Sequence, residues 1–228
     1  MPPATNSQEI DAGTVANHRI ANNLSMIAGL VRMQGSSIGE SPRPMAVGEV
    51  RFILEELGGR LETVARLHRL LANGQHEAPV DLAGYLRDIA EAVVSSLAFT
   101  GAARLRFLCD TGCLVPPERA LPLGLIVGEL VTNSLKYAHP TGIAGEIRVA
   151  CRSSRGGGIV IEISDDGVGL PEDFDPLNAG GLGLRLIRVL AKQLGATFAF
   201  ENEDIGLRFV LQMPAPVSGV EAIAAYSP

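Results

Sequence analysis

The sequence contains no tryptophan, and aromatic residues make up only 4% of its 228 positions. Basic residues are also few, because 19 Lys and Arg stand against 25 Asp and Glu and leave a net charge of −6. A nucleic-acid backbone is bound by a basic face, so this balance argues against nucleic acid as the main partner. The hydrophobic content of 46% is that of a folded protein and excludes a disordered chain.

Long apolar runs are absent as well. No window contains about 18 consecutive apolar residues, so we expect no membrane span. The N-terminal stretch MPPATNSQEIDAGTVANH has no basic start followed by an apolar segment. We therefore expect no secretion signal and a cytoplasmic location.

Cysteine occurs only three times, at Cys109, Cys113 and Cys151. Cys109 and Cys113 are spaced like half of a metal site, but no Cys or His pair follows them at ligand spacing. We expect buried free thiols in a reducing compartment.

The N-terminal part of the chain is patterned as two helices. In HRIANNLSMIAGLVRMQ (18–34) apolar residues recur every three or four positions, which predicts one helical face. The segment GSSIGESPRPM (35–45) breaks this pattern with Gly, Ser and two prolines. A second helix is predicted over 46–72, where the repeat returns and the adjacent Gly58 and Gly59 favour a bend.

A hairpin of two such helices has few residues for a core of its own. We expect two copies to pair into a four-helix bundle, which makes the protein a homodimer. The alternative is that the hairpin packs against its own C-terminal domain. The predicted organisation is a flexible N-terminus (1–14), the helical hairpin (15–76), a second domain (77–214) and a flexible tail (215–228).

The second domain alternates helical and strand patterns, so an α/β sandwich with helices on one face of a mixed sheet is expected. The whole chain is thus predicted to be α+β, a helical hairpin followed by this sandwich. The predicted helices span 81–97, 118–138 and 182–194, and the predicted strands lie near 104–109, 146–151, 159–164, 196–201 and 207–212.

The helix predicted over 118–138 carries a polar stripe. At 100° per residue Glu129, Asn133 and Lys136 share one face with Thr132, opposite an apolar face. Asn133 could ligate Mg²⁺ through its side-chain oxygen, with Glu129 beyond it on a metal-bound water. Lys136 could neutralise phosphate charge. Read alone, the stripe is equally a solvated helix face.

Two glycine motifs follow this helix. SDDGVGL (164–170) comes after an apolar strand, so Asp165 and Asp166 lie at a strand end, where a carboxylate can accept a hydrogen bond from an exocyclic amine such as that of adenine. Gly167 and Gly169 would let the backbone approach a flat base, although the same letters also predict a β-turn. GGLGLRLIRVL (180–190) leads into a helix whose N-terminus offers N–H groups to phosphate, without the Walker spacing.

In this order the motifs resemble the Bergerat ATP fold shared by gyrase, MutL, the heat-shock chaperones of ninety kilodaltons and histidine kinases. The resemblance implies binding of ATP and Mg²⁺, with Asp165 on the adenine amine and Asn133 on the metal. The matching residues are Glu129, Asn133, Lys136, Asp165, Gly167, Gly169, Gly181, Gly183 and Leu184.

The N-terminal helix carries a second resemblance, to the phosphoacceptor helix of the second dimerisation class of histidine kinases, close to the HWE kinases. That class shows His-Arg, then Asn-Asn-Leu, then an apolar stripe ending in Leu-x-x-Gln. Imidazole accepts a phosphoryl group near neutral pH because one ring nitrogen is unprotonated. Taken alone, His18 would be read as a merely exposed residue. The matching residues are His18, Arg19, Asn22, Asn23, Leu24, Ile27, Leu30 and Gln34.

Both resemblances together imply a histidine kinase that phosphorylates His18 from Mg-ATP and passes the phosphoryl group to an aspartate of a response-regulator receiver domain. Its input would come from an upstream sensor protein, or the chain is a fragment of a longer one. One alternative is a histidine phosphotransfer protein whose kinase-like domain no longer binds ATP. Another is a serine kinase or anti-sigma factor on the same ATP fold, which would not need His18.

Overall fold

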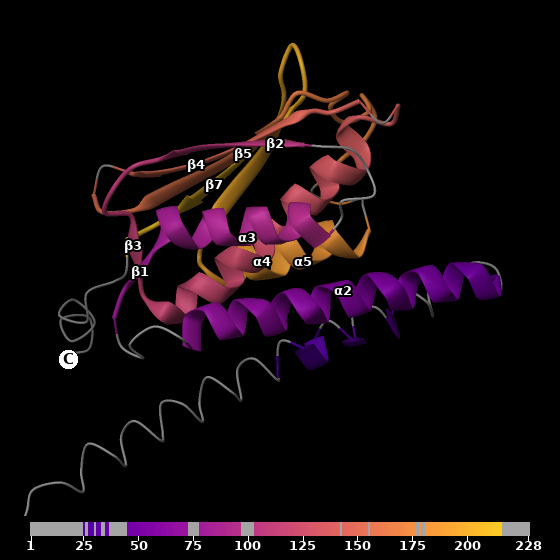
Figure 1. Cartoon of the computed structure of the whole chain (residues 1–228), viewed down its shortest axis with the longest axis horizontal. Coiled ribbons are helices and arrows are strands. Elements are labelled where there is room, and N and C mark those ends of the chain that lie inside the picture. Colours follow the sequence, from indigo (N-terminus) through magenta and orange to yellow (C-terminus); the bar gives the residue numbers. More distant parts are fainter. Residues whose placement is uncertain are drawn as a thin grey trace, which may run out of the picture. The chain divides into compact units, whose positions relative to one another are not determined.

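The computed structural model describes residues 25, 27–29, 31–32, 35–36, 45–72, 78–96, 103–141, 143–154, 156–176, 178 and 181–215 (Figure 1). His18, the predicted flexible N-terminus and residues 216–228 of the predicted tail lie outside this set. The described residues between 25 and 36 are helical, and they include Gly35 and Ser36, where the sequence predicted a break. The chain divides into two compact units, Met1–Ala65 and Arg66–Pro228.

Helix α2 spans Val47–Ala72 without a break, including the two adjacent glycines at 58 and 59. At its start the Ala46 N–H donates to Glu49 Oε2 over 2.8 Å, which satisfies a backbone donor that the helix leaves unpaired. Of the predicted apolar stripe, Val50, Ile53, Leu57 and Leu61 are partly buried and Val64 is fully buried. No helix among the described residues has the length and apolarity needed to cross a bilayer.

The second unit contains a five-stranded mixed sheet in the order β2-β4-β5-β7-β6. Strand β2 runs parallel to β4, and all other neighbours are antiparallel. A separate two-stranded sheet pairs β1 (Val80–Asp81) with β3 (Leu114–Val115). The five strands of the main sheet are β2 (Arg104–Cys109), β4 (Glu146–Ser153), β5 (Ile159–Asp165), β6 (Thr197–Asn202) and β7 (Leu207–Met213).

Three helices cover one face of this sheet (Figure 1): α3 (Leu82–Ser96), α4 (Pro117–Asn133) and α5 (Leu182–Gln193). Helix α4 packs against both α3 and α5, so its residues from Ala120 to Val131 are all buried. Pro117 occupies the first helical position of α4, where its missing N–H costs nothing. The largest fully buried side chains, which form the core, include Leu82, Leu86, Ile89, Leu123, Ile126, Ile161, Leu186, Ile187, Leu190 and Phe209.

Helix α4 continues into a π-helical turn, η1 (Ser134–Ala138), which replaces the last turn of the α-helix predicted over 118–138. The wider i→i+5 bonding inserts extra chain into the turn and is common at functional sites. The α+β class and the order of the predicted elements are confirmed. The π-helical turn and the short strands β1 and β3 were not predicted.

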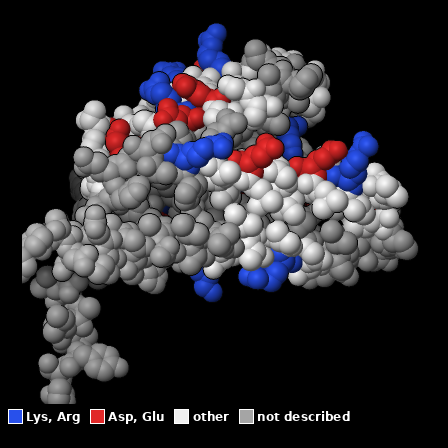
Figure 2. All heavy atoms as spheres, turned by 60° about the horizontal axis from the view of Figure 1, so that its bottom comes forward, with Lys and Arg blue, Asp and Glu red and all other residues white. Residues whose placement is uncertain are grey.

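Acidic and basic side chains are interspersed on the face of the described residues that Figure 2 shows, rather than gathered into one basic area. On the sheet, Arg208 pairs with Glu162 at 2.8 Å and with Glu201 at 3.0 Å. The described residues on this face therefore form no continuous basic area.

Candidate nucleotide-binding site

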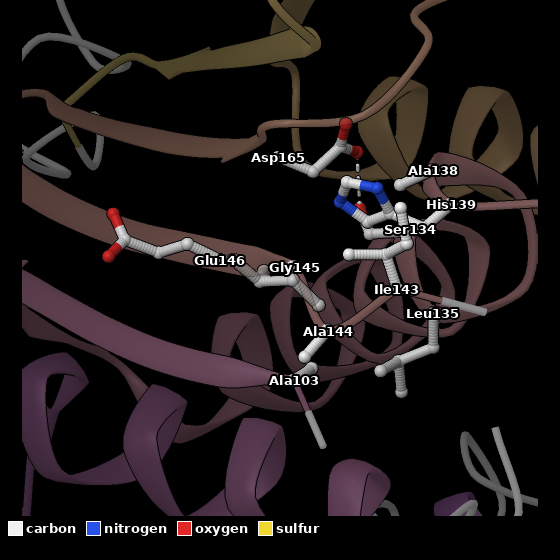
Figure 3. A pocket seen from close by; sticks show the side chains of 11 residues that line it. Ala103, Ser134, Leu135, Ala138, His139, Ile143, Ala144, Gly145, Glu146 and Asp165 are labelled. Carbon is white, nitrogen blue, oxygen red and sulfur yellow. Dashed lines mark hydrogen bonds between the residues drawn. The ribbon is translucent and has the colours of Figure 1, made fainter. Parts of the chain in front are cut away.

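Asp165 ends strand β5, and three hydrogen bonds fix its carboxylate. Its Oδ2 accepts from the Ser134 hydroxyl over 2.7 Å (Figure 3). Its Oδ1 accepts from the backbone N–H groups of Gly167 at 3.1 Å and Leu207 at 3.4 Å. The carboxylate is therefore held between η1 and the start of β7, in one orientation. An acceptor that is oriented before a ligand arrives is what recognition of an amine requires.

Asp166 points to different partners from its neighbour. Its Oδ1 lies 2.8 Å from His139 Nε2 and accepts from the Glu146 N–H over 2.8 Å. Burial pushes the pKa of Asp166 up, but the His139 hydrogen bond and the backbone N–H groups outweigh it, so the pKa is lowered from its usual value. These bonds tie together the end of η1, the start of β4 and the end of β5.

The glycines of this loop are required by close contacts within the protein. A Cβ at Gly167 would overlap Ala138, whose carbonyl accepts from the Val168 N–H over 3.0 Å. The sequence predicted that Gly167 makes room for a base, whereas the space is already taken by η1. Gly169 has φ +70°, which favours glycine, and a Cβ there would lie 2.9 Å from Asn202 Oδ1.

Sequence reasoning missed two residues of the β6–β7 hairpin that support the loop. Asn202 accepts from the Leu170 N–H at 2.9 Å through Oδ1 and donates to the Leu170 carbonyl at 2.9 Å through Nδ2. Gly206 has φ +92°, and a Cβ there would overlap the Asp165 carbonyl. Both residues lie far from the loop in sequence. The one available signal was that an Asn and a Gly stand between the two strands predicted near 196–201 and 207–212, where a turn is expected.

A cavity opens beside Asp165 and is lined by residues from η1, from the segment before β4 and from β4 itself (Figure 3). Its lining includes Ser134, Leu135, Ala138, His139, Ile143 and Asp165. Of the predicted site residues only Asp165 is part of this lining. The side chains of Val168, whose N–H donates to the Ala138 carbonyl, and of Tyr137, the residue before Ala138, are exposed.

The polar residues that were predicted to share one face of α4 differ in how far they are exposed. Glu129 is only 8% exposed and is the one charged residue classed as buried in the described part of the chain. Thr132, Asn133 and Lys136 are partly exposed. The projection at 100° per residue fails for Lys136 because the π-helical turn begins at Ser134. A buried carboxylate needs compensation, so the stripe is not an ordinary solvated face.

The second glycine motif forms the N-terminus of α5. Gly181 is its N-cap residue, with extended backbone and no side-chain capping bond. Gly183 is buried in the first turn, and Leu184 is partly buried. The first N–H groups of a helix lack partners and attract anions, so this end suits phosphate. Arg188 donates to the Pro176 carbonyl over 3.0 Å and ties the preceding loop to α5.

Among the described residues, the side-chain oxygens of Asn133 and Glu129 suit Mg²⁺ only together with the phosphates of a nucleotide. Within the described residues, no group of three or more His, Cys, Asp and Glu side chains could hold a metal ion. Mg²⁺ usually keeps waters and takes one or two protein oxygens plus substrate phosphates. Asn133 and Glu129, one turn apart on α4, supply an amide oxygen and a carboxylate of that kind.

A mixed sheet with helices on one face, an aspartate at the end of a central strand and a glycine-led helix define an ATP-binding domain of the gyrase and histidine-kinase class. Residues 118–217 match the family described as histidine kinase-, DNA gyrase B- and HSP90-like ATPase. Residues 16–97 match the HisKA_2 family, described as histidine kinase.

Curated relatives agree with both matches. The chain is 32% identical over 212 residues to the blue-light-activated histidine kinase 2 of Erythrobacter litoralis, covering 91% of this chain and 58% of that protein. It is 29% identical over 202 residues to the sensor histidine kinase PdtaS of Mycobacterium tuberculosis, covering 87% of this chain and 38% of the relative. The chain thus spans only about half of the length of these relatives.

A solved structure of the blue-light-activated histidine kinase EL346 of Erythrobacter litoralis matches with a TM-score of 0.66 and 26% identity. The match covers 94% of this chain and 62% of that one. The chain thus combines a HisKA_2 histidine-kinase segment at 16–97 with an ATPase domain of the histidine kinase, gyrase and HSP90 type at 118–217.

Proposed function

We propose that the chain is an ATP-dependent autokinase that transfers the γ-phosphoryl group of ATP to His18 and then to an aspartate of a response regulator. The observation that carries the proposal is the fixed carboxylate of Asp165, held by Ser134, Gly167 and Leu207 at the end of β5. Its orientation before any ligand binds suits the adenine amine. The HisKA_2 match over 16–97 includes His18 and supports it as the acceptor.

Each polar group has a task in this reaction. Asp165 accepts from the exocyclic amine of adenine, and the uncapped N–H groups at the start of α5 bind phosphate. Asn133 and Glu129 would hold Mg²⁺, which neutralises charge on the phosphates when bound. Lys136 adds positive charge at the same helix end. Phosphoryl transfer needs mainly positioning and charge neutralisation, and these residues supply both.

The transfer itself breaks the bond between the γ-phosphorus and the bridging oxygen of ATP and forms a bond from that phosphorus to an imidazole nitrogen of His18. ADP leaves with the bridging oxygen. The attacking nitrogen must be unprotonated, and imidazole meets this condition near neutral pH. Arg19 stands where better-known kinases place an acidic residue, and its charge favours the phosphorylated product.

The partners follow from the family. We infer that two copies pair through the HisKA_2 segment and that a response-regulator receiver domain docks there, since that segment carries His18. The curated relatives are longer, and two of them are named for a sensor or a light input. Signal input from a sensor is therefore part of the proposal, as is a cytoplasmic site of action, where ATP is available.

Labelled ATP tests the proposal directly. The wild-type chain should incorporate an acid-labile, base-stable phosphoryl group, while H18Q and N133A variants should incorporate none. Asn178→Ala serves as the matched control, because Asn178 is an exposed asparagine whose side-chain amide donates to Asp175 within its own loop. Undiminished labelling of the H18Q variant would show that His18 is not the phosphoryl acceptor. Labelling of wild type only by an upstream phosphodonor would indicate a passive phosphotransfer protein.

Mixing H18Q and N133A subunits tests the dimer at the same time. If one subunit phosphorylates its partner, the mixture should regain labelling on the N133A chains. If each subunit phosphorylates itself, the mixture stays inactive, and crosslinking or sedimentation then decides whether the chain is dimeric.

A further inference from the structure

Three thiols meet at the end of the sheet remote from Asp165. Cys109 and Cys151 are direct register partners in the parallel pair β2–β4. Cys151 also pairs with Ile161 of β5, four residues before Asp165. At about 3.3 Å per residue this places the thiols about 13 Å along the strand from the nucleotide-binding end. The nucleotide site therefore makes no use of them.

The thiols of these cysteines are near neighbours. Cys109 Sγ lies 3.8 Å from the Val149 carbonyl oxygen of β4, and the thiols of Cys109 and Cys113 are both near enough to Cys151 to raise its pKa. Cys113 Sγ also lies 3.7 Å from the Ser153 hydroxyl. Cys151 is thus the middle member of a chain of three thiols, all of them free.

The register of β2 and β4 suits a covalent bond between Cys109 and Cys151. Neighbouring strands lie about 4.8 Å apart, and disulfides form when the two Cα atoms are about 4.4–6.8 Å apart. Side chains alternate between the two faces of each strand, and Cys109 lies on the same, more buried face of β2 as Phe107, while Cys151 lies on the same buried face of β4 as Val149. Their Cβ atoms therefore lie on the same face of the sheet.

Cys109 and Cys151 differ in exposure and in the pKa of their thiols, and this suits them to different roles. Cys109 is partly exposed on the edge strand β2, whereas Cys151 and Cys113 are completely buried. The hydrogen bond with Cys151 lowers the pKa of Cys109 to about 7 despite its partial burial, with help from the Arg87 guanidinium. Arg87 lies 4.5 Å over the Phe107 ring, two residues from Cys109. The pKa of Cys151 is raised, first by its hydrogen bond to Cys109.

We propose that Cys109 and Cys151 form an oxidation site in which a hydroperoxide converts the two facing thiols into a disulfide. The Cys109 thiolate attacks one peroxide oxygen and breaks the O–O bond, which gives a sulfenic acid and, after protonation of the leaving oxygen, water or an alcohol. Cys151 then attacks the sulfenic sulfur, and the expelled hydroxide takes the Cys151 proton and leaves as water. Two thiols lose two electrons and the peroxide gains them.

The test uses the full chain, hydrogen peroxide and mass spectrometry of peptides after free thiols are blocked. The folded wild type should lose 2 Da and yield one linked peptide pair, Cys109 with Cys151, that a thiol reductant reverses. C113S is the matched control and should form the same link. C151S should leave a sulfenic acid on Cys109 that dimedone traps.

Three outcomes would overturn the proposal: all three thiols stay free at peroxide concentrations that oxidise glutathione, the link joins Cys113, or disulfides form only between two chains. The wild-type result stands even if a variant fails to fold. Because the readout needs no nucleotide and no phosphorylation, it is independent of the proposed kinase activity.

Discussion

Asn202 offers a direct test of how the nucleotide-binding loop is held. Its side-chain amide makes both a donor and an acceptor bond to the backbone of Leu170, the last residue of the loop that starts at Asp165. We expect Asn202→Ala to release the loop end without removing any group that would touch ATP. The nucleotide would then have to order the loop when it binds, and its affinity should fall.

The size of the effect follows from the two bonds. Each intramolecular hydrogen bond contributes about 0.5–1.5 kcal/mol, and these two are exposed to solvent, so about 0.5 kcal/mol each is reasonable. Their loss, about 1 kcal/mol in total, corresponds to roughly a fivefold increase in the Kd for ATP. Asn202→Asp should weaken binding at least as much, because a carboxylate oxygen would face the Leu170 carbonyl with no proton between them.

Isothermal titration with Mg-ATP and a thermal unfolding curve measure binding and folding separately. Ile205→Ala is the control, since Ile205 is 69% exposed on the same hairpin. Unchanged affinity in both Asn202 variants, with Tm also unchanged, would show that the loop does not depend on this anchor. A large drop in Tm with equal drops in the two variants would point instead to general destabilisation of the β6–β7 hairpin.

Three further outcomes are expected. Gly206→Ala should destabilise the fold strongly, because the new Cβ would overlap the Asp165 carbonyl. Gly195→Ala is the control: Gly195 has φ +63° with open space around it, so this change should cost only about 1 kcal/mol in urea unfolding. Equal losses of unfolding free energy in the two variants would contradict the overlap. The lowered pKa of Asp166 stabilises the fold at pH values above its unfolded value of about 3.9, and this stabilisation should be lost as pH falls through the folded pKa. Asp166→Asn should therefore flatten the acid limb of a Tm-against-pH curve, and an unaltered limb would assign that limb to other carboxylates. Glu129→Gln should reduce the affinity for ATP more in the presence of Mg²⁺ than in its absence. If titrations with and without Mg²⁺ show equal losses of affinity, Glu129 is not part of the metal site.

Asp165 could be predicted from sequence because its signal is local. An apolar strand that leads into Asp165 and Asp166, with Gly167 and Gly169 behind them, predicts a strand end and a tight loop, and the structure has both. The three helices of the second domain were likewise predictable from their apolar periodicity. The predicted roles of Glu129 and Asn133 are tested by the variants above, and the catalytic role of Lys136 stays a prediction.

The supports of the site were not predictable, because they join distant segments. Asn202 and Leu170 are 32 positions apart, and nothing near Asn202 announces its partner. The burial of Glu129 depends on the packing of α4 between α3 and α5, which a one-helix projection ignores. The π-helical turn at 134–138 has no periodic signature, so the projection misplaced Lys136.

This turn also affects how residues should be matched between this chain and its relatives. Counting positions along an ideal α-helix from Asn133 assigns the wrong direction to every side chain up to His139. A point substitution cannot convert one geometry into the other, since the difference is one of backbone length within the turn. A relative with a regular helix here would need a one-residue gap for its side chains to superpose, even where the two sequences align without one.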